Sequence, residues 1–222
     1  MDQNVILVET VPLEFDLESL GCRLRIRPGQ TKFMDRLSRL AEEAARVARP
    51  KAVARLCGLT ILDEEKVQVG EVTFSSPLLR QKMDGLERAF PYLASEGTEL
   101  ADWSLSLSSS LEQVFASALR EVAVQQAENL LERTLLERYG IAQVSAMNPG
   151  SLKVWSLEEQ VPLFELLAPL PEKLGVTLLP SLMMRPEYSV SGVFFQTDSK
   201  FYNCQLCPKK ECPNRRTPSL VT

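Results

Sequence analysis

Residues 181–196 read SLMMRPEYSVSGVFFQ, and this stretch constrains the fold more than any other part of the sequence. The apolar runs on either side of Arg185, Pro186 and Glu187 predict two strands joined by a short connection. Within the second strand, residues 189–192 alternate serine with valine and end on glycine. A glycine inside a strand marks a place where another group approaches the backbone closely. The pattern therefore predicts either a large ligand against the sheet or a closely packed helix.

Further strands are predicted along the rest of the chain. Residues 5–15 predict an N-terminal strand, residues 58–74 a β-hairpin or meander, and residues 141–147 a strand that leads into the loop NPGS. Residues 200–207 predict a last strand that runs into a cysteine-rich tail.

Two long segments have the apolar period of amphipathic helices. Residues 31–49 form the first, with Thr31 as the expected cap, and residues 108–139 form the second, which Gly140 ends. Strands and helices follow one another without a regular β-α-β repeat, so the sequence favours an α+β fold with a mostly antiparallel sheet.

Two shorter helices are predicted from their capping residues. Ser76, followed by Pro77, has the pattern of a helix start. Ser156 and Glu159 have the spacing of a capping box, and Pro162 lies far enough beyond them to predict a break or a kink.

Composition and charge exclude several classes of function. Apolar residues make up 45% of the 222 residues and charged residues 24%, as in a folded globular protein. The net charge is −4, which does not favour nucleic-acid binding. The chain has no histidine, so it has no Ser-His-Asp triad and no histidine-ligated zinc. Without a long apolar run or a secretory signal, we expect a cytoplasmic protein with no membrane contact.

The cysteines are clustered near the C-terminus. Cys204, Cys207 and Cys212 lie within nine residues, whereas the other two of the five, Cys22 and Cys57, lie far upstream. Five cysteines are an odd number and are spaced unevenly along the chain, which argues against a disulfide framework. Thiolates alone suit an iron–sulfur cluster or zinc, and unligated thiols are the third alternative. We divide the chain into one domain, residues 1–200, and a cysteine-rich basic tail, residues 201–222.

The C-terminal half of the chain resembles a known family. It is similar to the activation (reactivation) domain of cobalamin-dependent methionine synthase, in its stand-alone form. That family has a Pro-Gly loop, then a strand with the pattern T-x-S-x-x-M-x-P-x-x-S-V-S-G, then a D-S-K strand. The matching residues are Pro149, Gly150, Ser181, Met184, Pro186, Ser189, Val190, Ser191, Gly192, Asp198, Ser199 and Lys200.

This resemblance implies a C-shaped α+β domain that docks over the corrin of cobalamin and binds S-adenosylmethionine. It implies a corrinoid protein or corrinoid-dependent methyltransferase as the partner, and a low-potential electron donor. The residues that it assigns to the corrinoid are Asn148, Pro149, Gly150, Ser151, Ser189, Val190, Ser191 and Gly192.

The sequence departs from the family at three positions. The family loop reads R-x-x-P-G-Y, and here the arginine and tyrosine positions are Ala146 and Ser151. Downstream of the S-V-S-G pattern, this chain has Phe194 at a position where the family has a tyrosine. Because arginine grips a carboxylate through two hydrogen bonds and alanine does not, the departures argue against S-adenosylmethionine binding.

The cysteine cluster is an addition to the family pattern. We therefore expect a corrinoid-binding protein that assists reductive reactivation, with Cys204, Cys207 and Cys212 holding a [4Fe–4S] cluster. Cys22, Cys57 or a non-protein group is the candidate fourth ligand. One alternative is a non-catalytic corrinoid-binding or chaperone-like module with a structural zinc ion. Another is methyl transfer from S-adenosylmethionine to cobalamin.

Overall fold

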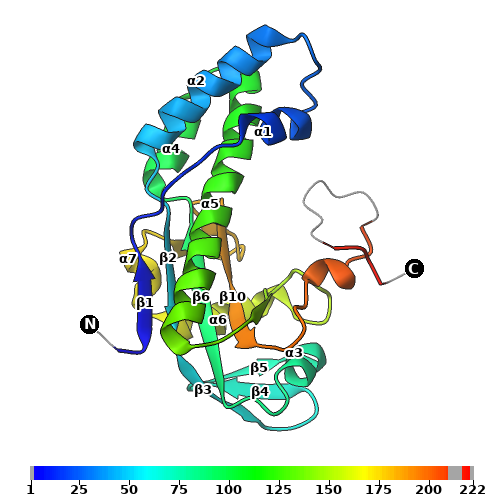
Figure 1. The fold of residues 1–222 in the computed structure, drawn as a ribbon. Helices are drawn as coiled ribbons and strands as arrows, with labels where there is room; N and C mark the ends of the chain where they lie inside the picture. Colours follow the sequence, from blue (N-terminus) through cyan, green and yellow to red (C-terminus); the bar gives the residue numbers. More distant parts are fainter. Residues whose placement is uncertain (1–2, 210–216, 221–222) are drawn as a thin grey trace.

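The structure, a computed structural model, describes residues 3–209 and 217–220. The chain is α+β, with an antiparallel sheet flanked by helices, as the sequence predicts (Figure 1). Every strand pair in these residues is antiparallel. Among the helices of the described residues, none combines the length and the apolar composition that crossing a membrane requires.

The eight-stranded sheet is built around strand β6, which pairs with three other strands. One path runs β1-β2-β6-β3-β4-β5, and β10 pairs with β6 on one side and β7 on the other. The strands are β1 (Val5–Val8), β2 (Lys51–Arg55), β3 (Cys57–Ile61), β4 (Lys66–Val69), β5 (Val72–Ser75), β6 (Arg88–Ser95), β7 (Val144–Met147) and β10 (Ser189–Gln196). A separate ribbon contains β8 (Thr177–Leu178) and β9 (Met184–Arg185).

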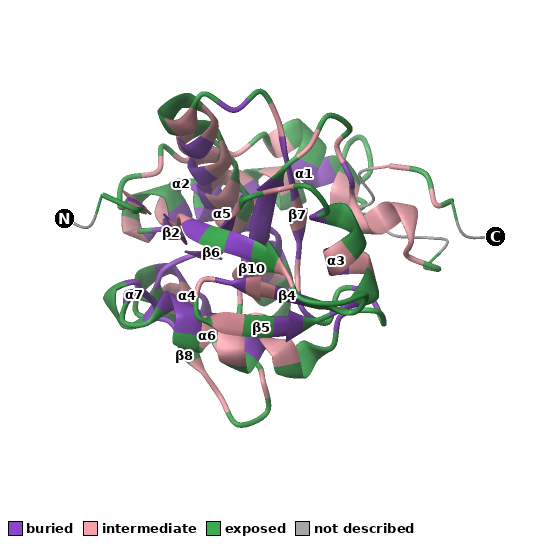
Figure 2. Cartoon of the chain, turned by 90° about the horizontal axis from the view of Figure 1, so that it is seen from below, coloured by how far each residue is buried: buried purple, intermediate pink, exposed green. Residues whose placement is uncertain are grey.

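Helices cover both faces of the sheet, and buried residues gather between the layers (Figure 2). Helix α5 (Ser110–Tyr139) crosses one face, where Ala127, Leu131 and Leu135 belong to the apolar cluster that the helix forms with β1, β2 and β6. Its N-terminal half continues beyond the sheet and packs with α1 (Leu17–Arg23), α2 (Thr31–Val47) and α4 (Thr98–Ser106), which together form the helical lobe. The other face is covered by α3 (Pro77–Lys82), η1 (Leu157–Glu159), α6 (Gln160–Leu167) and α7 (Leu170–Lys173).

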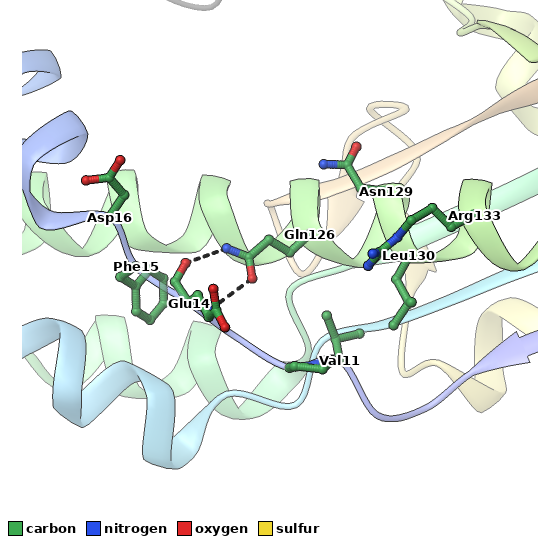
Figure 3. A pocket seen from close by; sticks show the side chains of 9 residues that line it. Val11, Glu14, Phe15, Asp16, Gln126, Asn129, Leu130 and Arg133 are labelled. Carbon is green, nitrogen blue, oxygen red and sulfur yellow. Dashed lines mark hydrogen bonds between the residues drawn. The ribbon is translucent and has the colours of Figure 1, made fainter.

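Residues 9–16 lead from β1 to the helical lobe as an extended segment along α5. The side-chain amide of Gln126 fastens this segment, because it accepts a hydrogen bond from the Glu14 N–H (3.1 Å) and donates one to the Glu14 carbonyl. A hollow of about 810 Å³ lies beside this contact, with Asn129 and Arg133 on the helix side (Figure 3). The sequence prediction of a strand over residues 5–15 is therefore wrong beyond Val8, where the chain leaves the sheet.

Other sequence predictions are confirmed where the signal is local. The α5 helix ends at Gly140, whose φ of 61° is left-handed. The hydroxyl of Ser76 accepts a hydrogen bond from the Leu79 N–H, and Pro77 begins α3. By contrast, α2 begins at Thr31 itself, with Gln30 rather than Thr31 at the cap position.

The predicted capping box at Ser156 and Glu159 is wrong. The Ser156 hydroxyl donates to the Glu158 carboxylate, and the Glu159 carboxylate accepts from the backbone N–H of Ser75 at 3.2 Å. A 3₁₀ turn occupies residues 157–159, and α6 then begins at Gln160. Pro162 thus falls within the first turn of α6, where the missing N–H breaks no helical hydrogen bond.

The predicted last strand at residues 200–207 is also wrong. The backbone N–H of Phe201 donates to the Ser145 hydroxyl (2.7 Å), so this segment binds β7 through a side chain rather than through a strand ladder. The chain then forms a 3₁₀ turn, η2 (Asn203–Gln205), which contains Cys204.

Candidate functional site

A cleft of about 210 Å³ lies where α5, β7, β10 and residues 200–204 meet. Glu128 and Glu132 line it from one turn of α5, and Ala146 and Asn148 line it from β7 and the following loop. Strand β10 contributes Val190 and Phe194 to the lining. The opposite wall is the segment Lys200, Phe201, Tyr202, Asn203 and Cys204.

A chain of hydrogen bonds fixes Asn148 at this cleft. The Tyr92 hydroxyl donates to the Glu128 carboxylate (2.7 Å), and its oxygen accepts from the Asn148 amide (2.8 Å). The same amide nitrogen also donates to the Ser191 carbonyl (2.9 Å). The Asn148 amide oxygen accepts from Asn203 (3.1 Å). Asn148 therefore links α5, the sheet and the cysteine-bearing turn, which is the kind of network that holds polar groups in one arrangement.

Gly192 makes room for Asn148. A Cβ at this glycine would lie 2.4 Å from the Met147 carbonyl oxygen, 2.6 Å from the Asn148 amide nitrogen and 2.9 Å from the Tyr92 ring. Close packing therefore explains the glycine, but its nearest neighbours are not the helix that one interpretation of the S-V-S-G pattern predicted. The three nearest groups come from the end of β7, from Asn148 just after it and from β6.

The predicted residues of β10 divide between the two faces of the sheet. Val190 lines the cleft on the α5 side. Ser189 and Ser191 point to the opposite face, because successive side chains of a strand alternate. The Ser189 hydroxyl lies 2.8 Å from the Pro186 carbonyl oxygen. The Ser191 hydroxyl is buried and has no hydrogen-bond partner within residues 3–209 and 217–220.

The predicted turn at Pro149, Gly150 and Ser151 lies next to the cleft and is held by Trp155. The Gly150 N–H donates to the Trp155 carbonyl (2.9 Å), and the buried Trp155 ring packs edge-on against Phe74 at 5.8 Å. Gly150 has a φ of 76°, and a Cβ there would lie 2.7 Å from Leu157. Gly150 and Ser151 are exposed, so the turn presents its tip to solvent on a rigid base.

Two positions at which the sequence departs from the family lie in the cleft. Ala146 and Phe194 are partners across the β7–β10 pair. Phe194 stacks on Tyr92 with ring centroids 3.9 Å apart, so a phenol is present one strand away from the phenylalanine. Because position 146 is alanine and not arginine, the Lys200 ammonium is the only cation among the described residues that line the cleft. It pairs with the Glu132 carboxylate.

Two of the three predicted metal ligands lie on one turn beside the cleft. Cys204 lines the cleft, and the Cys207 N–H donates to the Cys204 carbonyl (3.4 Å). The chain returns to this turn at its C-terminus, where the Ser219 hydroxyl donates to the Cys207 carbonyl (3.1 Å) and the Leu220 N–H to the Gln205 carbonyl (2.8 Å). Cys212 lies outside the described residues.

The suggested fourth ligands do not join this turn. Within residues 3–209 and 217–220, no three cysteine, aspartate or glutamate side chains gather in a metal-binding arrangement. Cys22 is exposed on α1, and Cys57 is buried in β3 among apolar side chains. Neither Cys22 nor Cys57 is therefore a ligand together with Cys204 and Cys207 in this structure.

No protein-family profile matches the sequence, and no curated protein matches it. Among solved structures, the crystal structure of the MetH reactivation domain bound to AdoHcy matches over 89% of this chain and 80% of that chain, with a TM-score of 0.60 and 17% sequence identity. The fold of this chain is similar to that of the MetH reactivation domain. At this level of identity the match to the MetH reactivation domain concerns the fold alone, and it agrees with the family resemblance drawn from residues between Pro149 and Lys200.

The contact at Gly192 gives the first prediction. We expect Gly192→Ala to lower the free energy of unfolding by about 1–3 kcal/mol, because its Cβ would lie 2.4 Å from the Met147 backbone carbonyl oxygen, so that the backbone must shift. Urea denaturation measures this loss. The matched control is Gly58→Ala in β3, where an added Cβ meets nothing within 4 Å. Equal stabilities of the two variants would contradict the packing described here.

Proposed function

We propose that this protein binds a corrinoid presented by a partner protein and assists its reductive reactivation. One observation carries the proposal: the cleft brings Asn148 and Val190, which the resemblance assigns to the corrinoid, next to Cys204. The similarity in fold to the MetH reactivation domain supports the same conclusion. The proposal covers corrinoid binding and electron delivery.

The cleft and its rim suit a corrin in two ways. A corrin is a wide, largely apolar disc that carries amide arms. Val190, which is half-buried, supplies apolar surface, and Glu128 and Asn203 supply an acceptor and an amide at the same place. The exposed turn at Gly150 and Ser151 lies beside this lining on a rigid base. Because Asn148 and Gly150 are already fixed by the protein, binding requires little ordering of the site.

The cysteine turn suits a thiolate-bound metal. Cys204 and Cys207 lie on one turn and are spaced as C-x₂-C, and Cys212 follows five residues later. Such thiolates fit an iron–sulfur cluster, and they also fit zinc. We favour a [4Fe–4S] cluster, which when bound would supply the single electron that reduction of Co(II) to Co(I) requires. We propose a non-protein group as the fourth ligand, since neither Cys22 nor Cys57 forms a metal-binding group with Cys204 and Cys207 in the described residues.

S-Adenosylmethionine is a weaker candidate ligand. The MetH reactivation domain in the matching structure holds AdoHcy. In this chain the family arginine is Ala146, and the nearby Glu128 and Glu132 would repel the carboxylate of an amino-acid group. We therefore propose that the protein transfers electrons to a corrinoid and does not supply a methyl group.

The metal proposal is tested by anaerobic purification followed by iron and sulfide analysis and visible spectra with and without dithionite. We expect iron and sulfide in the unmodified protein, and their loss in Cys204→Ser and in Cys207→Ser, because each variant removes a thiolate. The matched control, Cys22→Ser, changes an exposed cysteine on α1 and should keep the metal. Stoichiometric zinc, with no band that dithionite bleaches, would exclude the electron-transfer role.

Corrinoid binding is tested by titration with cobalamin and, in a parallel experiment, with S-adenosylmethionine. We expect Val190→Glu to weaken cobalamin binding about tenfold or more, a loss of about 1.4 kcal/mol, because it places a charge against the apolar disc. Val161→Glu is the matched control, since Val161 is an exposed valine on α6 that does not line the cleft. Equal affinities of the two variants, or no affinity for the corrinoid in either oxidation state, would refute the proposed site.

A further inference from the structure

The cleft at Asn148 is too small to hold a whole corrin. Its volume is about 210 Å³, which is below the range of about 300–1,000 Å³ that is usual for small-molecule sites. A corrinoid that lies over the cleft and its rim therefore places only part of its structure inside. The groups that line the cleft determine which part of the corrinoid fits.

Two side-chain amides in the wall are fixed by the hydrogen bonds that they already make. The Asn203 amide nitrogen donates to the Asn148 amide oxygen at 3.1 Å. The Asn148 amide nitrogen donates to the Ser191 carbonyl (2.9 Å) and to the Tyr92 hydroxyl oxygen (2.8 Å). These bonds determine the orientation of both amides. The Asn203 amide oxygen is then left over, because it is buried and has no hydrogen-bond partner among the described residues.

An unpartnered amide oxygen in the wall of a cleft points to a ligand that brings a donor group. Buried acceptors nearly always have a donor, because leaving one unpaired costs free energy. Glu128 lines the same cleft, and its carboxylate, which accepts from the Tyr92 hydroxyl at 2.7 Å, adds acceptor oxygens there. The lining therefore favours a group that carries N–H donors, and a primary amide carries two on one nitrogen.

The charges of the lining disfavour a carboxylate. Glu128 and Glu132 lie one helical turn apart on α5, and the Lys200 ammonium, which pairs with Glu132, is the only cation among the described lining residues. Two carboxylates against one ammonium leave one excess negative charge. Only 20% of the Glu132 side chain and 31% of the Lys200 side chain are exposed, so solvent screens these charges incompletely. A neutral amide enters this lining without repulsion, whereas a carboxylate is repelled.

We propose that the cleft receives one primary-amide arm of the corrin and excludes a carboxylate arm. The N–H groups of the arm donate to the Asn203 oxygen and to the Glu128 carboxylate, and Val190 contacts the apolar part of the ligand. The protein thus selects corrinoids whose arms are amides over corrinoids whose arms are carboxylates. This inference rests on the proposed function and extends it, because it specifies the chemical form of the corrinoid that binds.

Calorimetric titration of the full chain with cobinamide and with cobyrinic acid, both as dicyano complexes, tests this selection. The arms of cobinamide are amides, and those of cobyrinic acid are carboxylates on the same ring. We expect cobinamide to bind about tenfold or more tightly than cobyrinic acid. Equal affinities would overturn this inference and leave the proposed function standing, whereas no binding of either corrinoid would overturn both.

Charge-matched variants separate the cleft from the overall charge of the protein, which is −4 and also disfavours a polyanion. Glu128→Gln and Glu132→Gln each remove one negative charge from the cleft, and a glutamine at position 128 retains an oxygen that accepts from Tyr92. The matched control is Glu137→Gln, which changes an exposed residue of α5 outside the cleft. We expect both cleft variants to reduce the preference for cobinamide about threefold or more, and the control to leave it unchanged. A preference that falls equally in all three variants, or in none, would overturn the assignment to the cleft.

Discussion

The close contact between Gly192 and Asn148 is the constraint on which the rest of the cleft depends. Only a residue without a Cβ allows the Asn148 amide to approach the sheet here, where it binds the Ser191 carbonyl of β10 and the Tyr92 hydroxyl of β6. Tyr92 in turn fixes Glu128 on α5. One glycine in the central sheet thus determines where a loop, a helix and a carboxylate meet.

The same network explains how the cysteine-bearing turn is placed. Asn203 donates to Asn148, the Phe201 N–H donates to Ser145, and Lys200 pairs with Glu132. These contacts fasten residues 200–204 across the open side of the cleft, so that Cys204 becomes part of its wall. A metal held on this turn would be adjacent to whatever occupies the cleft, which is the arrangement that short-range electron transfer needs. The polar network therefore connects the fold to the proposed chemistry.

Local signals in the sequence predicted much of the fold. The 3.6-residue period and Gly140 defined α5, and the apolar run at residues 193–195 defined β10. The failures occur where a distant partner overrides a local preference. Glu159 binds Ser75 instead of capping its own helix, and Ser145 captures the Phe201 N–H in place of a strand partner.

The candidate site was predicted only in part, for a related reason. Asn148 and Val190 line the cleft, but Ser189 and Ser191 point to the other face, as the alternation of side chains along a strand requires. That division could have been foreseen from the sequence. Glu128, Glu132 and Asn203 could not, because each joins the cleft through contacts between residues far apart in the chain, such as Asn203 with Asn148, 55 residues away.

The central claim is that the turn carrying Cys204 delivers an electron to a corrinoid that lies over the adjacent cleft and its rim. The most direct measurement is the anaerobic rate of reduction of cob(II)alamin to cob(I)alamin by a limiting low-potential donor, followed by absorbance. The account predicts that the metal-loaded protein accelerates this step at least tenfold, equivalent to about 1.4 kcal/mol of barrier, and that Cys204→Ser binds cob(II)alamin but gives no acceleration. Equal rates with the unmodified protein, with Cys204→Ser and with no protein would contradict it.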